Sequence, residues 1–384
     1  MSDSKKKILF IIPSFGTGGT SSALLAMLQT LENTFDCNIF SMCKDGEMKE
    51  VFKKHKTYTH WLLNLFQCDF SKCSLSQKAI VFILKCIKRL ILAVNIDITG
   101  YVFKRVAREI EKKDNFDTII AYQEGDATAF VSYFKNKNKI AWIHCDYSFY
   151  TKADESKVYE KFKKIVCVSK YTANVFKGIY PRFAEKTTFI YNLCDYDKIV
   201  ALSNKAVNDS RFSNNDFTIV SIGRINKIKR FEHIPQIAYQ LKNNGISFKW
   251  YLIGSGDDIE LNNKIHKEIE SYKVNEQVVL LGHKSNVYPF LKNSNLLVAL
   301  SRSEACPMIF IEAKALNIPI VTTDFKTAFE FVDDGKNGLI APIESIADKI
   351  GYLAKNKEIY QEFISTLANN SIETPQDIKS TLMD

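Results

Sequence analysis

The sequence lacks several patterns that would assign it to common classes of protein. None of its nine cysteines forms a Cys-x-x-Cys pair and its six histidines have no ligand-like spacing, so the sequence offers no zinc or iron site. The scattered cysteines, odd in number, indicate reduced thiols in a cytosolic protein. No G-x-G-x-x-G fingerprint follows the first predicted strand, so a dinucleotide-dependent dehydrogenase is not expected.

The sequence also has no apolar run that is long enough to span a bilayer. The uncharged runs at 79–84 and 90–96 are far shorter than the ~20 residues that a membrane span requires. The N-terminus, 1–7, has no signal-peptide layout and leads directly into an apolar run. We therefore expect a cytoplasmic protein.

The composition is that of a soluble globular chain, and its positive charge is unevenly placed. Of the 384 residues, 46% are hydrophobic and 25% are charged, and the length suggests two domains. Residues 1–195 hold 30 lysines and arginines against 20 acids, whereas residues 196–384 hold 22 against 23. The excess of positive charge predicts an anionic partner for the first half.

Much of that charge lies in residues 77–113, which also contain long apolar stretches. A basic apolar helix is typical of a segment that lies at an anionic membrane surface. A buried helix whose lysines mark its exposed stripe is the alternative. We expect peripheral contact with the cytoplasmic membrane face and no binding of nucleic acid.

Short apolar runs alternate with helical stretches along both halves. Strands are predicted at 8–12, 37–42, 118–121, 139–143, 165–168 and 188–191, and again at 217–222, 248–253, 278–281, 296–300, 319–322 and 338–340. Helices are predicted at 24–31, 79–94, 103–111, 173–176, 231–243 and 309–316. This alternation indicates parallel sheets wrapped by crossover helices, and so an α/β fold of two Rossmann-like domains that face each other across a cleft.

A polar segment rich in Asn, Ser and Asp separates the halves and indicates a linker at 196–215. The predicted domains are therefore an N-terminal domain at 1–195 and a C-terminal domain at 216–357. A C-terminal helix within 358–384 is expected to pack back toward the N-terminal domain. Ligands of such sheets bind beyond the carboxyl ends of the strands.

One stretch of the second half places two carboxylates around a helix start. The strand at 296–300 ends in a polar loop, and Pro307 suits the first turn of the next helix because its missing amide hydrogen costs nothing there. Glu304 then lies on the loop and Glu312 inside the helix. The free amides between them form a site for a diphosphate, and the carboxylates can accept hydrogen bonds from sugar hydroxyls. A solvated helix face is the alternative.

A basic loop follows the first predicted strand of the second domain. It contains Gly223, Arg224 and Lys229. Arginine offers a bidentate fork to phosphate oxygens and lysine a point charge, so the two can neutralise a leaving diphosphate without a metal ion. Such a loop is often simply solvated, but its expected place opposite the Glu304 loop favours the phosphate role.

Two features of the first half lie where its sheet should meet a ligand. Gly18 and Gly19 form a loop between a strand and a helix, where glycine allows close approach of the backbone; a plain tight turn is the alternative. His144 ends an apolar strand, which favours a polar contact to substrate over a structural role. Asp195 and Asp197 spell the Asp-x-Asp of metal-dependent sugar transferases, but they lie at the linker, and chance explains the match better.

Together these positions resemble the retaining glycosyltransferases of family 4, which have the GT-B fold. The resemblance covers most of the chain and is densest from Phe217 to Ile340. It rests on the Glu304-to-Glu312 pair, Gly223-Arg224 with Lys229, Ile253-Gly254-Ser255-Gly256, Asp334-Gly335-Lys336-Asn337-Gly338, Asn192-Leu193-Cys194-Asp195 and the Gly18-Gly19 loop. Their combined order makes the resemblance specific.

The resemblance implies that the N-terminal domain binds the acceptor and the C-terminal domain binds the nucleotide sugar, and it implies a role for each matching residue. Glu312 would bind the ribose hydroxyls and Glu304 the hydroxyls of the donor sugar, while Arg224 and Lys229 would hold the diphosphate. The further implied donor contacts are Gly223 and Gly254 in the glycine loops, amides near Met308 and Ile309 at the diphosphate, Gly282 and His283 at the base, His144 at the sugar, and Gly18 and Gly19 at the phosphates. His144, Arg224, Lys229 and Glu304 form the implied catalytic group.

The resemblance also implies an activity. It predicts a retaining hexosyltransferase that needs no metal or other cofactor and uses a nucleotide sugar, preferably a UDP-sugar. The acceptor would be a polyprenyl-diphosphate-linked sugar or a glycan, in the synthesis of capsule, O-antigen or exopolysaccharide. A nucleotide-sugar epimerase of the GT-B type and a non-catalytic sugar-nucleotide-binding subunit are the alternatives.

The chain departs from the family pattern at a few positions. It has Cys306 and Asn317 where family members often have glycine, which bears on the loop over the donor. It also has Thr20-Ser21-Ser22 where others have bulkier or acidic residues, which leaves the acceptor contacts open.

Overall fold

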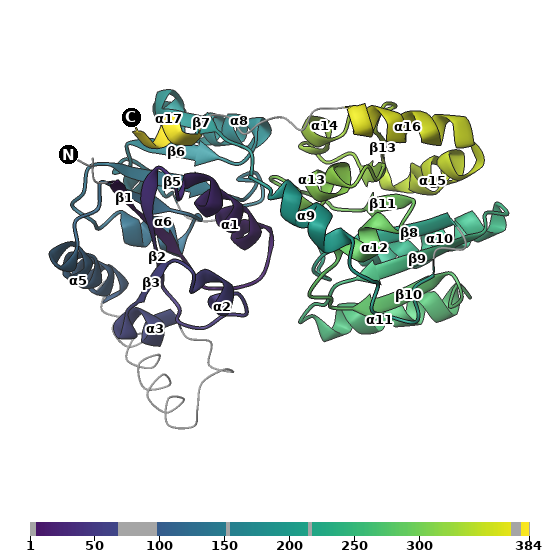
Figure 1. Ribbon diagram of the computed structural model, residues 1–384, viewed down its shortest axis with the longest axis horizontal. Helices are drawn as coiled ribbons and strands as arrows, with labels where there is room; N and C mark the ends of the chain where they lie inside the picture. The colour runs from purple at the N-terminus through teal and green to yellow at the C-terminus, as the bar shows by residue number, and fades with distance from the viewer. Residues whose placement is uncertain (1–4, 68–97, 151–153, 214–216, 370–377, 384) are drawn as a thin grey trace, which may run out of the picture. The chain divides into compact units, whose positions relative to one another are not determined.

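The computed structural model describes residues 5–67, 98–150, 154–213, 217–369 and 378–383. The chain divides into two units, Met1–Leu193 with Pro375–Asp384, and Cys194–Thr374. Each unit is built on one parallel sheet that helices cover (Figure 1). The predicted class, an α/β protein with two Rossmann-like domains, is confirmed.

The sheet of the first unit has seven parallel strands in the order β3-β2-β1-β4-β5-β6-β7. The strands are β1 (Lys6–Ile12), β2 (Phe35–Ser41), β3 (Lys56–Thr59), β4 (Thr118–Ala121), β5 (Lys139–Ile143), β6 (Lys164–Cys167) and β7 (Thr187–Phe189). The helices are α1 (Gly19–Leu31), α2 (Lys49–Phe52), α3 (Trp61–Gln67), α5 (Ile98–Lys113), α6 (Asp126–Val131), α7 (Ser156–Tyr159), α8 (Lys170–Ile179), the 3₁₀ turn η2 (Pro181–Lys186) and the C-terminal α17 (Ile378–Met383).

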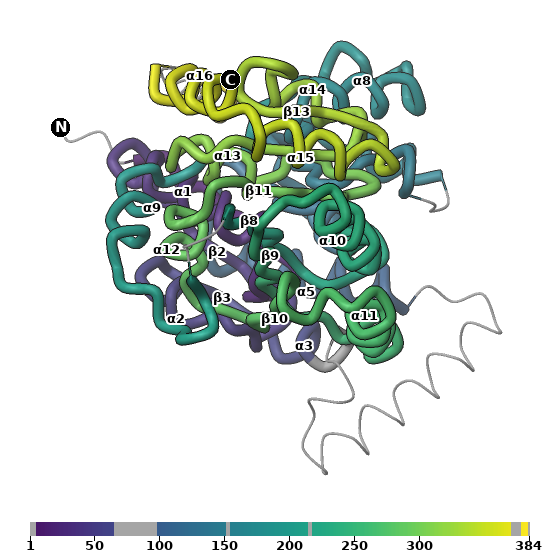
Figure 2. The backbone as a smooth tube through the Cα atoms, turned by 90° about the vertical axis from the view of Figure 1, so that its right-hand side faces the viewer, coloured from purple at the N-terminus to yellow at the C-terminus, as the bar shows by residue number. Residues whose placement is uncertain are grey.

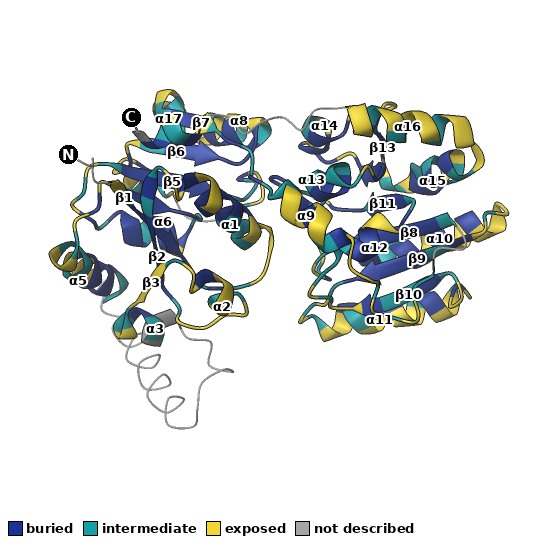
Figure 3. Cartoon of the chain, viewed as in Figure 1, coloured by how far each residue is buried: buried dark blue, intermediate teal, exposed yellow. Residues whose placement is uncertain are grey.

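Alternation along β1 shows why both faces of this sheet need helices. Leu9 and Ile11 pack in one cluster with Val102 and Phe103 of α5, whereas Phe10 points to the other face and contacts Tyr122 edge-on. A strand that is apolar on both faces is typical of a parallel sheet between helical layers. Figure 3 shows the result, with buried strands and exposure concentrated on the outer faces of helices.

The sheet of the second unit has six parallel strands in the order β10-β9-β8-β11-β12-β13. They are β8 (Phe217–Ile222), β9 (Phe248–Ile253), β10 (Val278–Gly282), β11 (Leu296–Ala299), β12 (Ile320–Thr323) and β13 (Gly338–Ala341). The helices are α9 (Tyr196–Ser203), α10 (Ile234–Asn243), α11 (Ile259–Ser271), α12 (Tyr288–Lys292), α13 (Met308–Ala315), α14 (Ala328–Phe331), α15 (Ile346–Lys355) and α16 (Lys357–Asn369), with 3₁₀ turns η3 (Phe231–His233) and η4 (Ile343–Ser345). Helices α10 and α11 lie side by side against this sheet (Figure 2).

Several elements of the structure lie outside the predicted ranges, and three observations bear on the predicted organisation. Strand β3 was not predicted, because it is an exposed edge strand that pairs only with β2 and carries no apolar run. Helix α9 lies inside the expected linker and packs on α12 and α13 of the second unit. Of the helices within 358–384, α16 belongs to the second unit and packs on α15, whereas α17 belongs to the first unit, where the Lys164 Nζ donates to the Thr381 carbonyl at 3.1 Å.

The remaining described residues of the expected linker, 204–213, are held by hydrogen bonds as well. Asp209 accepts hydrogen bonds from Lys284 (2.8 Å) and Arg211 (2.7 Å), and Arg211 donates to the carbonyls of Leu280 and Leu281 on β10. Polar side chains that bind backbone groups have the same composition as solvated ones, so composition alone indicated a linker. The predicted helix at 79–94 lies outside the described residues, and so do residues 77–97 of the predicted membrane-surface segment.

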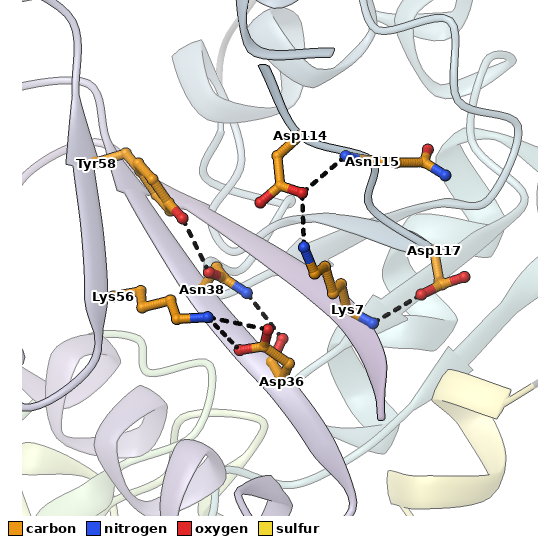
Figure 4. Close-up of polar contacts among 8 residues, drawn as sticks. All are labelled: Lys7, Asp36, Asn38, Lys56, Tyr58, Asp114, Asn115 and Asp117. Carbon is orange, nitrogen blue, oxygen red and sulfur yellow. Dashed lines mark hydrogen bonds and ion pairs between the residues drawn. The ribbon is translucent and has the colours of Figure 1, made fainter. Parts of the chain in front are cut away.

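A polar network ties together the amino ends of the strands in the first unit (Figure 4). The Lys7 Nζ donates to Asp114 (2.7 Å) and the Lys7 backbone N–H to Asp117 (2.7 Å), while Lys56 pairs with Asp36 (3.2 Å). These pairs are solvent-exposed, so each contributes little to stability. They lie at the sheet edge opposite to the one that carries Gly18 and His144.

No helix among the described ranges is both long and apolar enough to cross a membrane. The described part of the basic segment, α5, is instead amphipathic, with Val102, Phe103, Val106 and Ala107 buried on one side.

The loops after β8 and β9 approach each other backbone to backbone, which requires glycine. The amide of Gly223 donates to the Ile253 carbonyl and that of Ile225 to the Ser255 carbonyl, both at 3.0 Å. A Cβ on Gly254, which has φ +148°, would lie 1.9 Å from the Gly223 carbonyl oxygen. Two loops of the candidate site are therefore fixed to each other by main-chain contacts.

We expect Gly254→Ala to destabilise the second unit by about 3 kcal/mol or more, because the backbone must move to relieve the clash. Gly351→Ala in α15 is the matched control, since the nearest atom to its Cβ would be Leu241 Cδ2 at an ordinary 3.8 Å. There the helix should gain about 0.5–1 kcal/mol. Calorimetric unfolding measures both, and equal stability of the two variants would contradict the close approach.

Candidate active site

The sequence-predicted residues of the second unit lie at one edge of its sheet. Parallel strands end together at this edge, and the loops after β8, β9, β10 and β11 leave it. These loops and α13 carry Gly223, Arg224, Lys229, Gly254, Gly282, His283, Glu304, Met308, Ile309 and Glu312.

An ion pair joins the basic loop to the acidic loop. The Lys229 Nζ binds Glu304 Oε1, and the Ser301 hydroxyl donates to the same oxygen at 2.7 Å. Both charged side chains are largely buried, with 22% and 17% of their surface exposed, so solvent screens the pair less than a surface pair. The backbone continues this link, since the Arg302 N–H donates to the Ile228 carbonyl at 2.8 Å.

Hydrogen bonds from neighbouring residues fix the shape of both loops. Asn226 Oδ1 accepts from the amides of Ile228 and Lys229, both at 3.0 Å, which closes the turn that positions the lysine. On the acidic loop, the Thr327 hydroxyl donates to the Glu304 carbonyl at 2.6 Å and Thr323 to the Ser301 carbonyl at 2.6 Å. The ion pair is thus held by a defined backbone.

Helix α13 begins directly after the acidic loop. Pro307 occupies the position before the first helical residue, Met308, one place earlier than predicted. The first amides of a helix have no partner inside it, so those of Met308 and Ile309 are donors four and five residues after Glu304. Asn317, just after the C-cap residue Leu316, has φ +56°, a conformation that asparagine tolerates and glycine prefers. This explains why glycine is frequent there in the family that the sequence resembles.

Glu312 is buried one turn into α13. Only 9% of the residue is exposed, and its Oε1 accepts a hydrogen bond from the Tyr288 hydroxyl at 3.2 Å. Burial raises the pKa of Glu312 to about 7, and the hydrogen bond from Tyr288 acts in the opposite direction. A carboxylate in this setting is poised to accept hydrogen bonds from a ligand that replaces lost water.

Other predicted residues share this edge but are not held by the ion pair. Arg224, Gly282 and His283 are exposed. Gly282 has φ +73°, and its carbonyl accepts from the Gly254 amide at 3.0 Å, so the loop after β10 is tied to the loop after β9. Arg224 and His283 are thereby available to a ligand from solvent.

In the first unit, His144 follows β5 and Gly18 precedes α1. The His144 amide donates to Glu124 at 2.8 Å, and its ring lies 4.7 Å from that of Tyr122. Burial lowers the pKa of His144 to about 3, so the ring is neutral, and its Nε2 has no hydrogen-bond partner among the described residues. Gly18 (φ +141°) and Gly19 are exposed at the start of α1, which has no side-chain cap.

Sequence reasoning missed the residues that support this site. Tyr288, Ser301 and Thr327 are ordinary loop or helix residues, and no local pattern marks them as partners of the glutamates. Glu124 gave a signal, because it follows the predicted strand at 118–121. Asp195 caps α9 by accepting from the Lys198 amide at 3.0 Å, which gives the Asp-x-Asp match a structural role.

Comparison with known proteins shows which family the second unit is similar to. Residues 203–369 match the family model described as glycosyl transferases group 1. An uncharacterized glycosyltransferase of Methanocaldococcus jannaschii is 28% identical over 51% of this chain and 47% of its own length. The capsular polysaccharide biosynthesis glycosyltransferase CapM of Staphylococcus aureus is 31% identical over 47% of this chain and 46% of its own length. The chain thus spans about half the length of these curated relatives.

Solved structures give the fold of the whole chain. The Anabaena protein HepE, solved in complex with UDP and glucose, superposes with a TM-score of 0.69 at 17% identity, covering 94% of this chain and 93% of its own. At that identity the likeness shows the fold, which is GT-B.

The raised pKa of Glu312 gives a stability that depends on pH. The folded state holds this proton more tightly than the unfolded chain, so the stabilisation is complete below about pH 4.5 and is lost as pH rises through 7. Between pH 5 and pH 8 we expect the wild type to lose on the order of 3 kcal/mol more than Glu312→Gln. Urea unfolding at both pH values measures the difference.

Tyr288→Phe provides the second arm of this test. It removes the hydrogen bond that lowers the pKa of Glu312, so the loss of stability should extend to higher pH than in the wild type. Parallel pH profiles for the wild type and Glu312→Gln would show that Glu312 titrates normally and would refute the account.

Proposed function

We propose that this protein is a retaining, metal-independent glycosyltransferase of family 4 that moves a hexose or N-acetylhexosamine from a UDP-sugar to a lipid-linked or glycan acceptor. The Lys229–Glu304 ion pair beside the α13 start carries the proposal. It places a cation and free amides next to a carboxylate, and a nucleotide sugar offers phosphates next to hydroxyls. The family match of residues 203–369 supports the assignment.

Lys229 is able to hold the diphosphate without releasing Glu304. Its ammonium group has three donors, one of which binds Glu304 Oε1. The others remain for phosphate oxygens, together with the amides of Met308 and Ile309 and the exposed guanidinium of Arg224. These groups stabilise the charge that develops on the leaving diphosphate, which is the larger electrostatic contribution to the rate.

The carboxylates orient the rest of the donor. Glu304 accepts hydrogen bonds from hydroxyls of the sugar, and the buried Glu312 accepts them from the ribose. The nucleotide base lies at the loop of Gly282 and His283, where backbone N–H and C=O groups recognise it by hydrogen bonding. The HepE structure holds UDP and glucose, which supports UDP as the nucleotide.

The reaction exchanges one bond at the anomeric carbon. Its bond to the phosphate oxygen breaks, the acceptor oxygen bonds on the same face, and the acceptor proton passes to the departing diphosphate. Neutral His144 serves as a hydrogen-bonding contact to the sugar and not as a cation, because its pKa is far below neutrality. Gly18 and Gly19 line the phosphate and acceptor side.

The acceptor is proposed to be a polyprenyl-diphosphate-linked sugar or a growing glycan of a surface polysaccharide. CapM is named for capsular polysaccharide biosynthesis, which supports this class. A lipid-linked acceptor also explains the positive charge of residues 1–195, because the protein would work at the anionic cytoplasmic face of the membrane.

Thermal unfolding with a panel of UDP-, GDP- and ADP-sugars in EDTA tests the donor. A ligand that binds only the folded state at 100 times its Kd stabilises by about 2.7 kcal/mol, so a UDP-sugar should raise the unfolding temperature by a few degrees. The stabilising donor is then incubated alone and with acceptor. We expect sugar transfer only when acceptor is present, and we expect the product to retain the anomeric configuration of the donor.

A different result of this experiment would contradict each part of the proposal. No shift with any sugar nucleotide would reject donor binding, and a requirement for manganese would reject charge neutralisation by Lys229 and Arg224. Conversion of the UDP-sugar without acceptor would indicate an epimerase instead.

A further inference from the structure

Helices α3 and α5 of the first unit present two aromatic side chains to solvent. Trp61 is 69% exposed and Tyr101 is 68% exposed, more than any other aromatic side chain among the described residues. Large aromatic groups normally bury most of their surface. Two of them on one pair of helices mark a surface that needs a partner.

The two aromatic residues belong to one continuous surface. The His60 ring stacks on Trp61 with 6.0 Å between ring centroids, and its Nε2 contacts Glu109 at 3.1 Å. Glu109 accepts from Arg105 Nε at 3.1 Å, and Arg105 also interacts with Tyr101. Helices α3 and α5 lie side by side in Figures 1 and 2.

A stripe of cations runs along α5 from Tyr101. Lys104, Arg108 and Lys112 follow at helical spacing and are exposed, while the opposite side of the helix is buried. None of the three pairs with a carboxylate of the described residues, whereas Arg105 is already neutralised by Glu109. We define the α3–α5 face as Trp61, Tyr101, Lys104, Arg108 and Lys112.

We propose that the α3–α5 face docks on an anionic lipid bilayer, with Trp61 and Tyr101 at headgroup level and the cations on lipid phosphates. Tryptophan and tyrosine are enriched at that depth because one end of each ring system is apolar and the other polar. Lysine and arginine side chains that pair with no described carboxylate complement an anionic leaflet. A single nucleic-acid strand is bound in a groove, whereas this face consists of two helix surfaces. The inference rests on the proposed function for its reason, access to a lipid-linked acceptor.

The protein carries a built-in probe of this contact. Of its three tryptophans, Trp142 and Trp250 are 1% and 0% exposed, so Trp61 alone reports on the surface. The full chain is mixed with vesicles of phosphatidylcholine containing phosphatidylglycerol, with or without brominated acyl chains. We expect a blue shift and bromine quenching that Trp61→Phe abolishes, and neither effect with phosphatidylcholine alone.

Charge variants separate docking from general attraction. Replacing Lys104, Arg108 and Lys112 by glutamine should weaken co-sedimentation with the anionic vesicles roughly a hundredfold, since each such cation contributes about a factor of five. The matched control replaces the exposed Lys135, Lys137 and Lys157 of the same unit and should lose far less. Unfolding curves confirm that each variant is folded.

Several results would overturn the inference. Absence of quenching, equal loss in the two triple variants, or binding of a single-stranded RNA in place of vesicles would each reject the bilayer as partner. The vesicle assay contains no sugar nucleotide, so its result does not depend on the proposed function. A protein that binds vesicles but transfers no sugar in the transfer assay would refute the proposed function and leave this inference standing. Transfer to a soluble glycan without vesicle binding would do the reverse.

Discussion

The candidate site depends on one ion pair, between Lys229 and Glu304. It connects the loop after β8 with the loop after β11, two strands that are neighbours in the second sheet. Without Lys229 the Glu304 carboxylate would keep only the Ser301 hydroxyl as a partner for Oε1, in a setting where it is largely buried. Removing one member of such a pair costs more than the pair contributes, because the other charge stays desolvated. The interaction therefore holds the two loops of the candidate site in one arrangement.

Main-chain contacts fix the backbone of the loop that carries Lys229. Gly254 lets the loop after β9 lie against the loop after β8, and Asn226 closes the turn that carries Lys229. Glu312 has a different environment. Burial raises its pKa to about 7, and the hydrogen bond from the Tyr288 hydroxyl lowers it. The two glutamates thus have the same chemistry and opposite settings, one ionised beside a cation and the other desolvated on a helix.

The sequence predicted the strands that show apolar runs and the residues that follow strand ends. It did not predict the contacts that depend on tertiary partners. The apolar runs predicted strands of both sheets, the loops after them contained Lys229 and Glu304, and the helix start at Pro307 placed Glu312 inside a helix. Strand β3 is an exposed edge strand without an apolar run, so the sequence pattern did not predict it. The segment at 204–213 looked like a linker because Asp209 and Arg211 are polar, although they bind Lys284 and the carbonyls of β10. Tyr288 reaches Glu312 from 24 residues away, which no local pattern encodes.

The most direct test compares the binding of UDP and uridine to the wild type, Lys229→Met and Lys227→Met by calorimetry. Lys227 is the exposed neighbour in the same loop and serves as the control. A hydrogen bond to a charged group contributes roughly 1.5–3 kcal/mol, so Lys229→Met should weaken UDP roughly 10- to 100-fold. The account predicts that uridine binding stays unchanged and that Lys227→Met resembles the wild type. Equal losses for UDP and uridine, or no loss for either, would contradict the role of Lys229 as the diphosphate contact.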